Sequence, residues 1–127
     1  MDFPDDLAYT RDHEWLRLEG ETGTAGITDY AQRELTDIVF VEFVAPGTVV
    51  RQGERFGTVE AIKAVSDLFS PVDGEIVEVN AELSTHPEWV NQDPYGKGWM
   101  VKIRVSDPAQ VRTLLSAADY RTLVASG

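Results

Sequence analysis

Hydrophobic and polar residues alternate along much of this chain, in short runs separated by glycine and proline. Residues 14–18, Glu-Trp-Leu-Arg-Leu, alternate and are followed by a glycine-flanked turn at 20–23 and a second run at 24–27. This pattern predicts a β-hairpin. Residues 38–44 are rich in β-branched and aromatic side chains and stop before Pro46-Gly47, which predicts a further strand.

One short helix is predicted between these strands. Thr28 is a suitable N-cap for residues 29–35, and Asp29 places an acidic side chain in the first turn. The helix dipole favours a negative charge at that end.

The strand pattern continues on both sides of a lysine. Residues 56–60 and 67–70 flank a few residues centred on Lys63, so the lysine is predicted at or next to a hairpin tip. Asp73-Gly74 predicts the next turn, and residues 75–80 predict a returning strand. Trp99, Val101, Ile103 and Val105 alternate with polar neighbours in the last strand. Many short strands of this kind predict a barrel or sandwich.

The C-terminal residues predict a helical segment. Asp107 and Pro108 form a capping start, and Ser116 with Asp119 repeats the pattern, so two short helices with a break between them are an alternative to one helix. We therefore predict a single domain, residues 1–127, with a core over about residues 8–105 and a C-terminal helical extension over about 107–125.

Composition excludes several classes of function. The formal net charge of −11 repels phosphate backbones and anionic lipids, so we expect neither nucleic-acid nor membrane binding. The longest central apolar run, residues 38–41, is far too short to span a bilayer. Cysteine is absent, which excludes disulfides and thiolate metal sites, and His13 and His86 lack metal-ligand spacing.

The first residues are acidic and carry no signal or transit pattern. A cytoplasmic location is the simplest expectation, or the mitochondrial matrix for a processed eukaryotic protein.

Lys63 is one of only three lysines, with Lys97 and Lys102. On position alone, a lysine at a hairpin tip is usually a solvated charge. The surrounding residues 57–80, GTVEAIKAVSDLFSPVDGEIVEVN, change this interpretation. They resemble the lipoylation site of the glycine cleavage system H proteins, and the resemblance extends to residues 13–15, 26–32, 39–42, 90–96 and 98–99.

The resemblance implies a mainly β fold of the lipoyl-domain type. This is a flattened barrel or sandwich of two small antiparallel sheets, with a short internal helix and a C-terminal helical segment. It further implies a lipoate attached covalently to Lys63 as N6-lipoyllysine. Glu60 and Gly74, three residues before and eleven after Lys63, are implied to help the lipoylating enzyme recognise the turn.

The resemblance also implies a non-catalytic carrier with three partner enzymes. The P protein, a pyridoxal-phosphate glycine decarboxylase, passes an aminomethyl group to the arm, and the T protein, an aminomethyltransferase, removes it. The L protein, dihydrolipoyl dehydrogenase, then reoxidises the dithiol. A lipoyl donor or relay that passes lipoate to other acceptor proteins is the alternative function, and an unmodified binding module is a third.

An aminomethyl group is labile and cationic, so a carrier would benefit from a cleft lined with acceptors. Glu14 and Asp67 are the candidates, with Asp12 and Glu34 as weaker ones, although each can also be read as an ordinary surface carboxylate. Thr36 stands where the family commonly has glycine, which leaves the local turn in question because a non-glycine residue disfavours positive φ.

Overall fold

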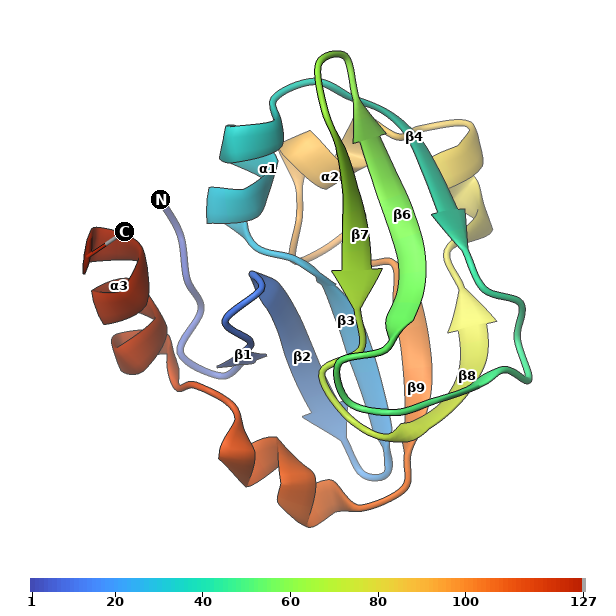
Figure 1. Ribbon diagram of the computed structural model, residues 1–127, viewed down its shortest axis with the longest axis vertical. Helices are drawn as coiled ribbons and strands as arrows, with labels where there is room; N and C mark the ends of the chain where they lie inside the picture. Colours follow the sequence, from blue (N-terminus) through green and yellow to red (C-terminus); the bar gives the residue numbers. More distant parts are fainter. Residues whose placement is uncertain (127) are drawn as a thin grey trace.

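The computed structural model describes residues 1–126, which form two antiparallel sheets facing one another (Figure 1). The larger sheet has the strand order β1 (Ala8–Tyr9), β2 (Glu14–Glu19), β3 (Thr22–Ile27), β9 (Val101–Val105), β8 (Gly74–Val79) and β5 (Val49–Val50). The smaller sheet has the order β4 (Ile38–Phe43), β6 (Arg55–Ala61) and β7 (Val65–Phe69). The predicted two-sheet fold is therefore confirmed.

Short helices connect and flank the strands. They are α1 (Asp29–Leu35), α2 (Trp89–Gln92) and α3 (Ala117–Ser126), with 3₁₀ segments at Ala81–Ser84 and Pro108–Thr113. α1 has the predicted bounds because Thr28 accepts the Ala31 N–H at its start. Among the described residues, no helix is long and apolar enough to cross a membrane.

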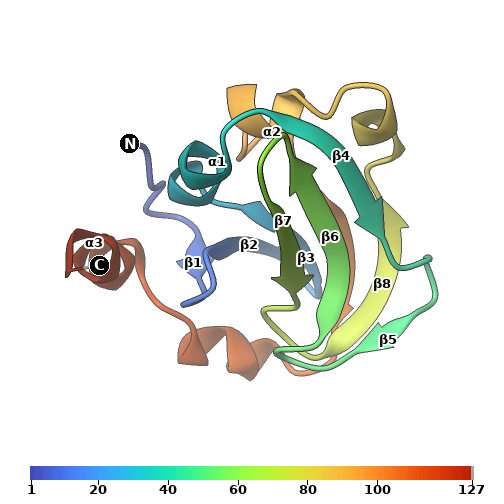
Figure 2. The same cartoon turned by 45° about the horizontal axis from the view of Figure 1, so that its top comes forward.

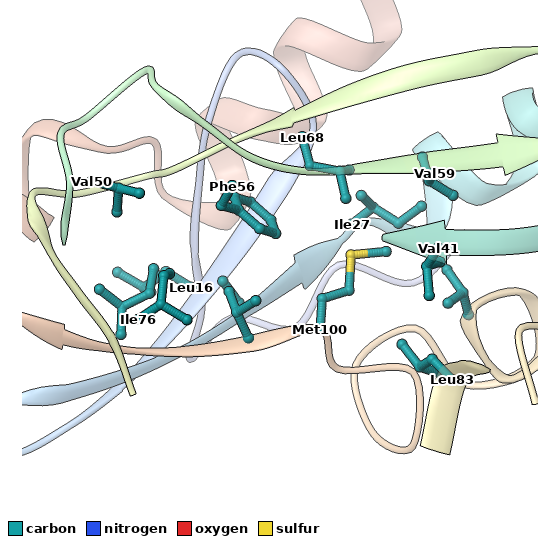
Figure 3. Close-up of a cluster of buried hydrophobic side chains, with 14 of the residues drawn as sticks. Leu16, Ile27, Val41, Val50, Phe56, Val59, Leu68, Ile76, Leu83 and Met100 are labelled. Carbon is teal, nitrogen blue, oxygen red and sulfur yellow. The ribbon is translucent and has the colours of Figure 1, made fainter. Parts of the chain in front are cut away.

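The main hydrophobic core lies between the two sheets. Its side chains point toward one another from strands of both sheets, as Figure 3 shows for Leu16, Phe56, Leu68, Ile76 and Met100. All five are at most 2 % exposed. Burial of this apolar surface is the largest favourable contribution to folding, and it fixes the position of one sheet relative to the other.

A second cluster covers the opposite face of the larger sheet. Trp15 and Leu16 are neighbours on β2, so their side chains point to opposite faces, and Trp15 joins this second cluster. Tyr120 of α3 stacks on Tyr9, with 4.7 Å between ring centroids. Phe3, near the N-terminus, meets Tyr120 edge-on. α3 is thereby held beside β1 and β2, away from the smaller sheet (Figure 2).

The C-terminal segment contains the break that the capping pattern allowed. Asp107 accepts the Ala109 N–H at the start of the 3₁₀ segment Pro108–Thr113, and Ser116 accepts the Asp119 N–H at the start of α3. Two short helices therefore stand in place of one. The proposed boundary between core and extension stays a prediction, and Gly127, the last residue of the predicted domain, lies outside the described residues.

The structure adds details that the pattern did not predict. β1, α2 and the 3₁₀ segment at Ala81–Ser84 were not expected as elements. Thr36 has a φ of 63°, so a threonine adopts a positive φ that non-glycine residues disfavour. Its carbonyl accepts a hydrogen bond from Asn91 Nδ2 at 2.8 Å, which helps to hold that turn.

Candidate functional site

Lys63 is the middle residue of the three-residue loop, residues 62–64, that joins β6 to β7. This loop forms the upper tip of the hairpin in Figure 1. Glu60 pairs with Val65, and the Ala61 N–H donates to the Ala64 carbonyl at 2.7 Å. Lys63 and its loop neighbour Ile62 are both exposed. The predicted position of the lysine at a hairpin tip is confirmed.

The loop has a rigid base. The Ile62 N–H donates to the Asp37 carbonyl at 3.2 Å, and Ala61, just before the loop, is 4 % exposed. Of the non-glycine residues described, His13 and Thr36 alone have positive φ, so Lys63 needs no strained backbone. The sheet holds the Lys63 backbone in place while its side chain is left exposed.

Glu60 and Gly74, the two predicted recognition residues, lie far apart. Glu60 is exposed on the hairpin, close to Lys63. Gly74 begins β8 at the opposite end of the sheets (Figure 1). A Cβ atom at Gly74 would stand 2.3 Å from the Arg104 carbonyl oxygen, so the close pairing of β8 with β9 requires glycine there.

Glu14 is the most deeply buried carboxylate of the site. It begins β2 and is 1 % exposed, and its Oε1 accepts from the Thr10 hydroxyl at 2.6 Å. Its Oε2 accepts from the Phe69 N–H at 3.3 Å, so the side chain links the larger sheet to β7 of the smaller one. Burial raises the pKa of Glu14 to about 8, against the opposing effect of these hydrogen bonds.

A cavity of about 260 Å³ opens beside Glu14, between α1, β2 and β7. We call it the Glu14 cavity. Its apolar lining comes from Ile27, Tyr30, Ala31, Leu35, Val59 and Leu68. Its polar lining comes from Asp12, His13, Glu14, Glu34, Ser66 and Asp67. All four carboxylates predicted from the sequence therefore line one cavity, with no lysine or arginine among the lining residues.

A second cavity of about 290 Å³ lies on the other side of Glu14, toward the C-terminal segment. Its lining includes Tyr9, Gln52 and Leu114, and it shares only Asp12 and Glu14 with the Glu14 cavity. It contains neither Ser66 nor Asp67, the residues that follow Lys63 along β7. We call the β6–β7 hairpin the lysine hairpin. It lines the second cavity only through Phe69, at the far end of β7, whereas it lines the Glu14 cavity through Ser66 and Asp67, close to Lys63.

Sequence reasoning missed a hydrogen-bonded group that supports His13, one of the residues lining the cavity. Tyr120 Oη lies 2.8 Å from His13 Nδ1 and 2.7 Å from Thr28 Oγ1, which in turn caps α1. Burial lowers the pKa of His13, although Asp12 and Glu34 oppose this. The nearest sequence signal was the capping pattern at Thr28, because His13 and Tyr120 are 107 residues apart.

The chemistry of the Glu14 cavity suits an apolar chain that carries a positive charge. Aliphatic and aromatic side chains supply an apolar wall, and the carboxylates supply acceptors for a cation. Among the described residues, no group of three or more His, Cys, Asp or Glu side chains is arranged to hold a metal ion.

Comparison with known proteins decides the family. The family model described as "Glycine cleavage H-protein" matches residues 7–127. The chain belongs to the glycine cleavage H-protein family. It is similar to the glycine cleavage system H protein of Chlorobium limicola, with 59 % identity over 126 residues, or 98 % of each chain. It is also similar to that of Rubrobacter xylanophilus, with 55 % identity over 119 residues, covering 94 % of this chain and 92 % of the relative.

A solved structure supports the same conclusion. The crystal structure of a glycine cleavage system H protein from Mycobacterium marinum superimposes with a TM-score of 0.84 at 38 % identity. The match covers 94 % of this chain and 97 % of that one. The likeness in sequence and in structure extends over nearly the whole chain, so it is not confined to residues 57–80 around Lys63.

Family membership settles the general role. This chain is a lipoylated, non-catalytic carrier subunit of the glycine cleavage system, and its partners are the P, T and L proteins. The comparisons concern the whole chain. The roles of individual residues are proposed below from the geometry of the site.

Proposed function

We propose that Lys63 is the lysine that carries the lipoyl group. The observation that carries this proposal is its placement in the exposed β6–β7 loop. The other two lysines lie against aromatic rings: Lys97 Nζ is 5.3 Å from the Trp89 ring centroid, and Lys102 Nζ is 5.2 Å from that of Trp99. Lys102 Nζ also lies 3.7 Å from Glu78.

The residues of the Glu14 cavity fit the attached arm. When bound, lipoate supplies a dithiolane disulfide that exchanges with thiols and carries a group between enzymes. Ser66 is three residues beyond Lys63 along the chain, on β7, a separation of roughly 10 Å at about 3.3 Å per residue. A lysine side chain extended by an acyl chain can cover that distance, so the arm can turn back from Lys63 into the cavity.

Glu14 and Asp67 are the proposed contacts for a cationic group in this cavity. A cation beside Glu14 favours the ionised carboxylate and offsets the burial that otherwise keeps its proton bound. Asp67 adds a second carboxylate on the hairpin side, and Asp12 and Glu34 strengthen the negative potential at the rim. The apolar wall limits the access of water to a labile group held there.

Glu60 and Gly74 support lipoylation in different ways in this proposal. Glu60 can contact an approaching enzyme directly, because it is exposed beside the loop. Gly74 acts through the fold, because it allows β8 to pair closely with β9. Removing Glu60 should therefore slow modification without unfolding, whereas substituting Gly74 should first lower stability.

Intact-mass measurement with peptide mapping tests the proposal. The protein is produced in a lipoate-supplied host with an active lipoylating system, beside a control lipoyl domain. One lipoyl-amide increment on the Lys63 peptide is the expected result. An unmodified Lys63 beside a modified control would contradict it. Transfer of the arm from the modified protein to another apo acceptor would favour the alternative role of lipoyl relay.

We also place the carrier in the cytoplasm. The relatives named above are bacterial, and the family's partners act on small soluble metabolites, which supports this location. Fractionation of cells that make the protein tests it, and recovery in the periplasmic or membrane fraction would count against it.

A further inference from the structure

The wall that α1 contributes to the Glu14 cavity has little hydrophobic anchoring. None of the seven residues of α1 is buried, although Ala31 and Leu35 pack partly against the main core. An isolated helix shorter than about 12 residues is marginal in water. The position of this wall therefore depends on what holds the two ends of α1. The cavity-lining residues that α1 supplies are Tyr30, Ala31, Glu34 and Leu35.

The N-terminal end of α1 is held by several residues. Thr28 Oγ1 accepts the Ala31 N–H at 3.2 Å, and Tyr95 Oη accepts the Asp29 N–H at 2.9 Å. The Asp29 carboxylate also accepts the backbone N–H of Asp2 at 2.9 Å. Loss of one of these contacts leaves the others in place.

The C-terminal end of α1 is held by the side chain of Asn91, on the neighbouring helix α2 (Figure 1). Its Nδ2 donates to Gln32 Oε1 at 3.0 Å and to the Thr36 carbonyl at 2.8 Å. Its Oδ1 accepts the Ile38 N–H at 3.0 Å. A side-chain amide has two N–H donors and one carbonyl oxygen, so all of these groups are in use. One side chain therefore joins the helix, the turn after it and the start of β4.

Asn91 itself stands on a rigid base. Its neighbour Val90 is 0 % exposed and belongs to the main core. Beyond α2, the Pro94 carbonyl accepts from Trp15 Nε1 at 3.1 Å, which ties this segment to β2 of the larger sheet. The hydrogen bonds of Asn91 thus fix α1 relative to the sheet that carries Glu14.

The turn that Asn91 holds also touches the lysine loop. Asp37 lies between the two backbone groups that bind Asn91, and its carbonyl accepts the Ile62 N–H at 3.2 Å. Residues 36–38 therefore contact the loop of Lys63 on one side and α1 on the other. An arm attached to Lys63 and lying in the cavity spans these two places.

We propose that Asn91 is a positioning residue for the loaded arm, because it sets the Lys63 loop and the α1 wall of the Glu14 cavity relative to one another. This role rests on the proposed function, in which the arm occupies that cavity. Asn91 is not among the residues that line the cavity, so it acts through α1 and residues 36–38. Without it, the end of α1 can move outward and admit water to the labile group.

Release of the aminomethyl group tests this role. Carriers are lipoylated and loaded by the P protein, then separated, and release is followed as free ammonia and formaldehyde. Asn91→Ala should release the group about fivefold faster than the parent, the effect of one ordinary hydrogen bond. Because the carrier is separated before release is measured, recognition by the P protein does not affect this rate.

Asn80→Ala is the matched control. Asn80 also makes three side-chain hydrogen bonds: it donates to the Lys97 and Trp99 carbonyls at 2.9 and 2.8 Å and accepts the Glu82 N–H at 3.3 Å. It lines neither the Glu14 cavity nor the second cavity. This variant should lose as much stability in urea as Asn91→Ala but release the group within about twofold of the parent's rate.

Asn91→Asp separates the two sides of the contact. It keeps an acceptor for the Ile38 N–H but loses both donors and places a carboxylate oxygen against the Thr36 carbonyl. We expect release at least as fast as from Asn91→Ala. Amide hydrogen exchange should also be faster at Thr36, whose N–H donates to the Gln32 carbonyl, and unchanged in β9. This variant carries the test if Asn91→Ala does not fold.

The outcomes are distinguishable. Release at the parent's rate from a folded Asn91 variant overturns the role of Asn91 and leaves that of Glu14 intact. Equal acceleration in Asn80→Ala also overturns it, because a general loss of stability then explains the effect. A parent that releases the group as fast as free aminomethyl-dihydrolipoamide contradicts the proposed function instead, because the cavity then gives no protection.

Discussion

Lys63 and Glu14 lie in opposite environments, although both are held by the lysine hairpin. Lys63 is exposed on a loop whose backbone is anchored, whereas Glu14 is 1 % exposed and is anchored through its side chain to Thr10 and Phe69. In the proposed function, the first is reached by other proteins and the second holds a cationic group away from water. The same strand, β7, begins beside Lys63 and ends at the hydrogen bond to Glu14, so one hairpin serves both needs.

This difference indicates which substitutions should affect attachment of the lipoyl arm and which should affect retention of the aminomethyl group in the cavity. Substitutions at the exposed loop should alter whether the arm is attached and should leave stability nearly unchanged. Substitutions at the buried carboxylate should alter what the cavity holds and how the protein responds to pH.

The largest expected effect is at Lys63. Lys63→Arg keeps the charge but removes the acceptor amine, so lipoylation should be abolished, as measured by intact mass. The side chain is exposed, so the free energy of unfolding should change by less than about 0.5 kcal/mol. Lys97→Arg is the control and should remain fully modified. A lipoyl increment retained by Lys63→Arg would show that another residue carries the arm.

The pH dependence of stability should depend on Glu14. Its pKa is about 8 in the folded protein against 4.5 for an ordinary glutamate, so the folded state holds a proton that the unfolded state has lost. Stability contributed by this group is present below about pH 4.5 and is lost as the pH rises toward about 8. Glu14→Gln should be more stable than the parent above that pH, by about 3 kcal/mol.

Urea unfolding at several pH values measures this effect. His13 has a lowered pKa and gives the opposite slope below 6.5, so the comparison is made above that pH. Glu42→Gln, at an exposed carboxylate of β4, is the control and should follow the parent. A Glu14→Gln curve parallel to the parent's would mean that Glu14 titrates normally.

Retention of the aminomethyl group should also depend on Glu14. Glu14→Ala removes a proposed acceptor for the cation, so spontaneous loss from the loaded carrier should be faster by about tenfold, the effect of one charge-assisted hydrogen bond. Glu42→Ala, outside the cavity, should lose the group at the parent's rate. Release is followed as free ammonia and formaldehyde, and an unchanged rate for Glu14→Ala would remove Glu14 from this role.

Tyr120→Phe tests how far the cavity wall depends on α3. The substitution removes the hydroxyl between His13 and Thr28 but keeps the ring stacked on Tyr9, so we expect a loss of about 1 kcal/mol. Tyr30→Phe, which removes a hydroxyl from a residue that lines the cavity, is the matched control and should lower the free energy of unfolding by less. Unfolding in urea gives both values, and equal effects would argue against a specific role for the Tyr120 hydroxyl.

The smallest effect concerns the junction between the two regions. Thr36 ends α1, which lines the Glu14 cavity, and precedes β4, which pairs with β6, the strand that leads to Lys63. Its φ of 63° strains a β-branched residue, so Thr36→Gly should stabilise the protein by about 0.5 kcal/mol. Thr36→Ala keeps a Cβ and should bring no gain. The thermal midpoints of the two variants check this.

Local signals in the sequence were enough for much of the fold and for the position of Lys63 at a hairpin tip. Asp73-Gly74, the Thr28 cap and the alternation in residues 101–105 each act within a few residues, and the structure contains the elements they predict. The motif around Lys63 is also local. These features need no knowledge of distant contacts.

The burial of Glu14 could not be predicted in this way. Glu14, Trp15 and Leu16 are all buried, which breaks the alternation expected of a strand with one exposed face. The cause is tertiary. α3 and the N-terminal residues cover Trp15 on the outer face of β2, whereas Glu14 shares the inner face with Leu16 and is covered by β7, whose Phe69 N–H it accepts. The two-residue strands β1 and β5 likewise carry too short a pattern to be recognised.

Sheet topology also sets the order in which these regions can fold. The strands of the smaller sheet lie within residues 38–69, whereas β3 pairs with β9 across a gap of about eighty residues, and β9 separates β3 from β8. Long-range pairing carries a larger loop-closure cost and is slower. During synthesis the lysine hairpin can therefore form while β9 and Tyr120 are still unmade, so a nascent chain should present its acceptor loop before β3 has its β9 partner and before Tyr120 contacts His13.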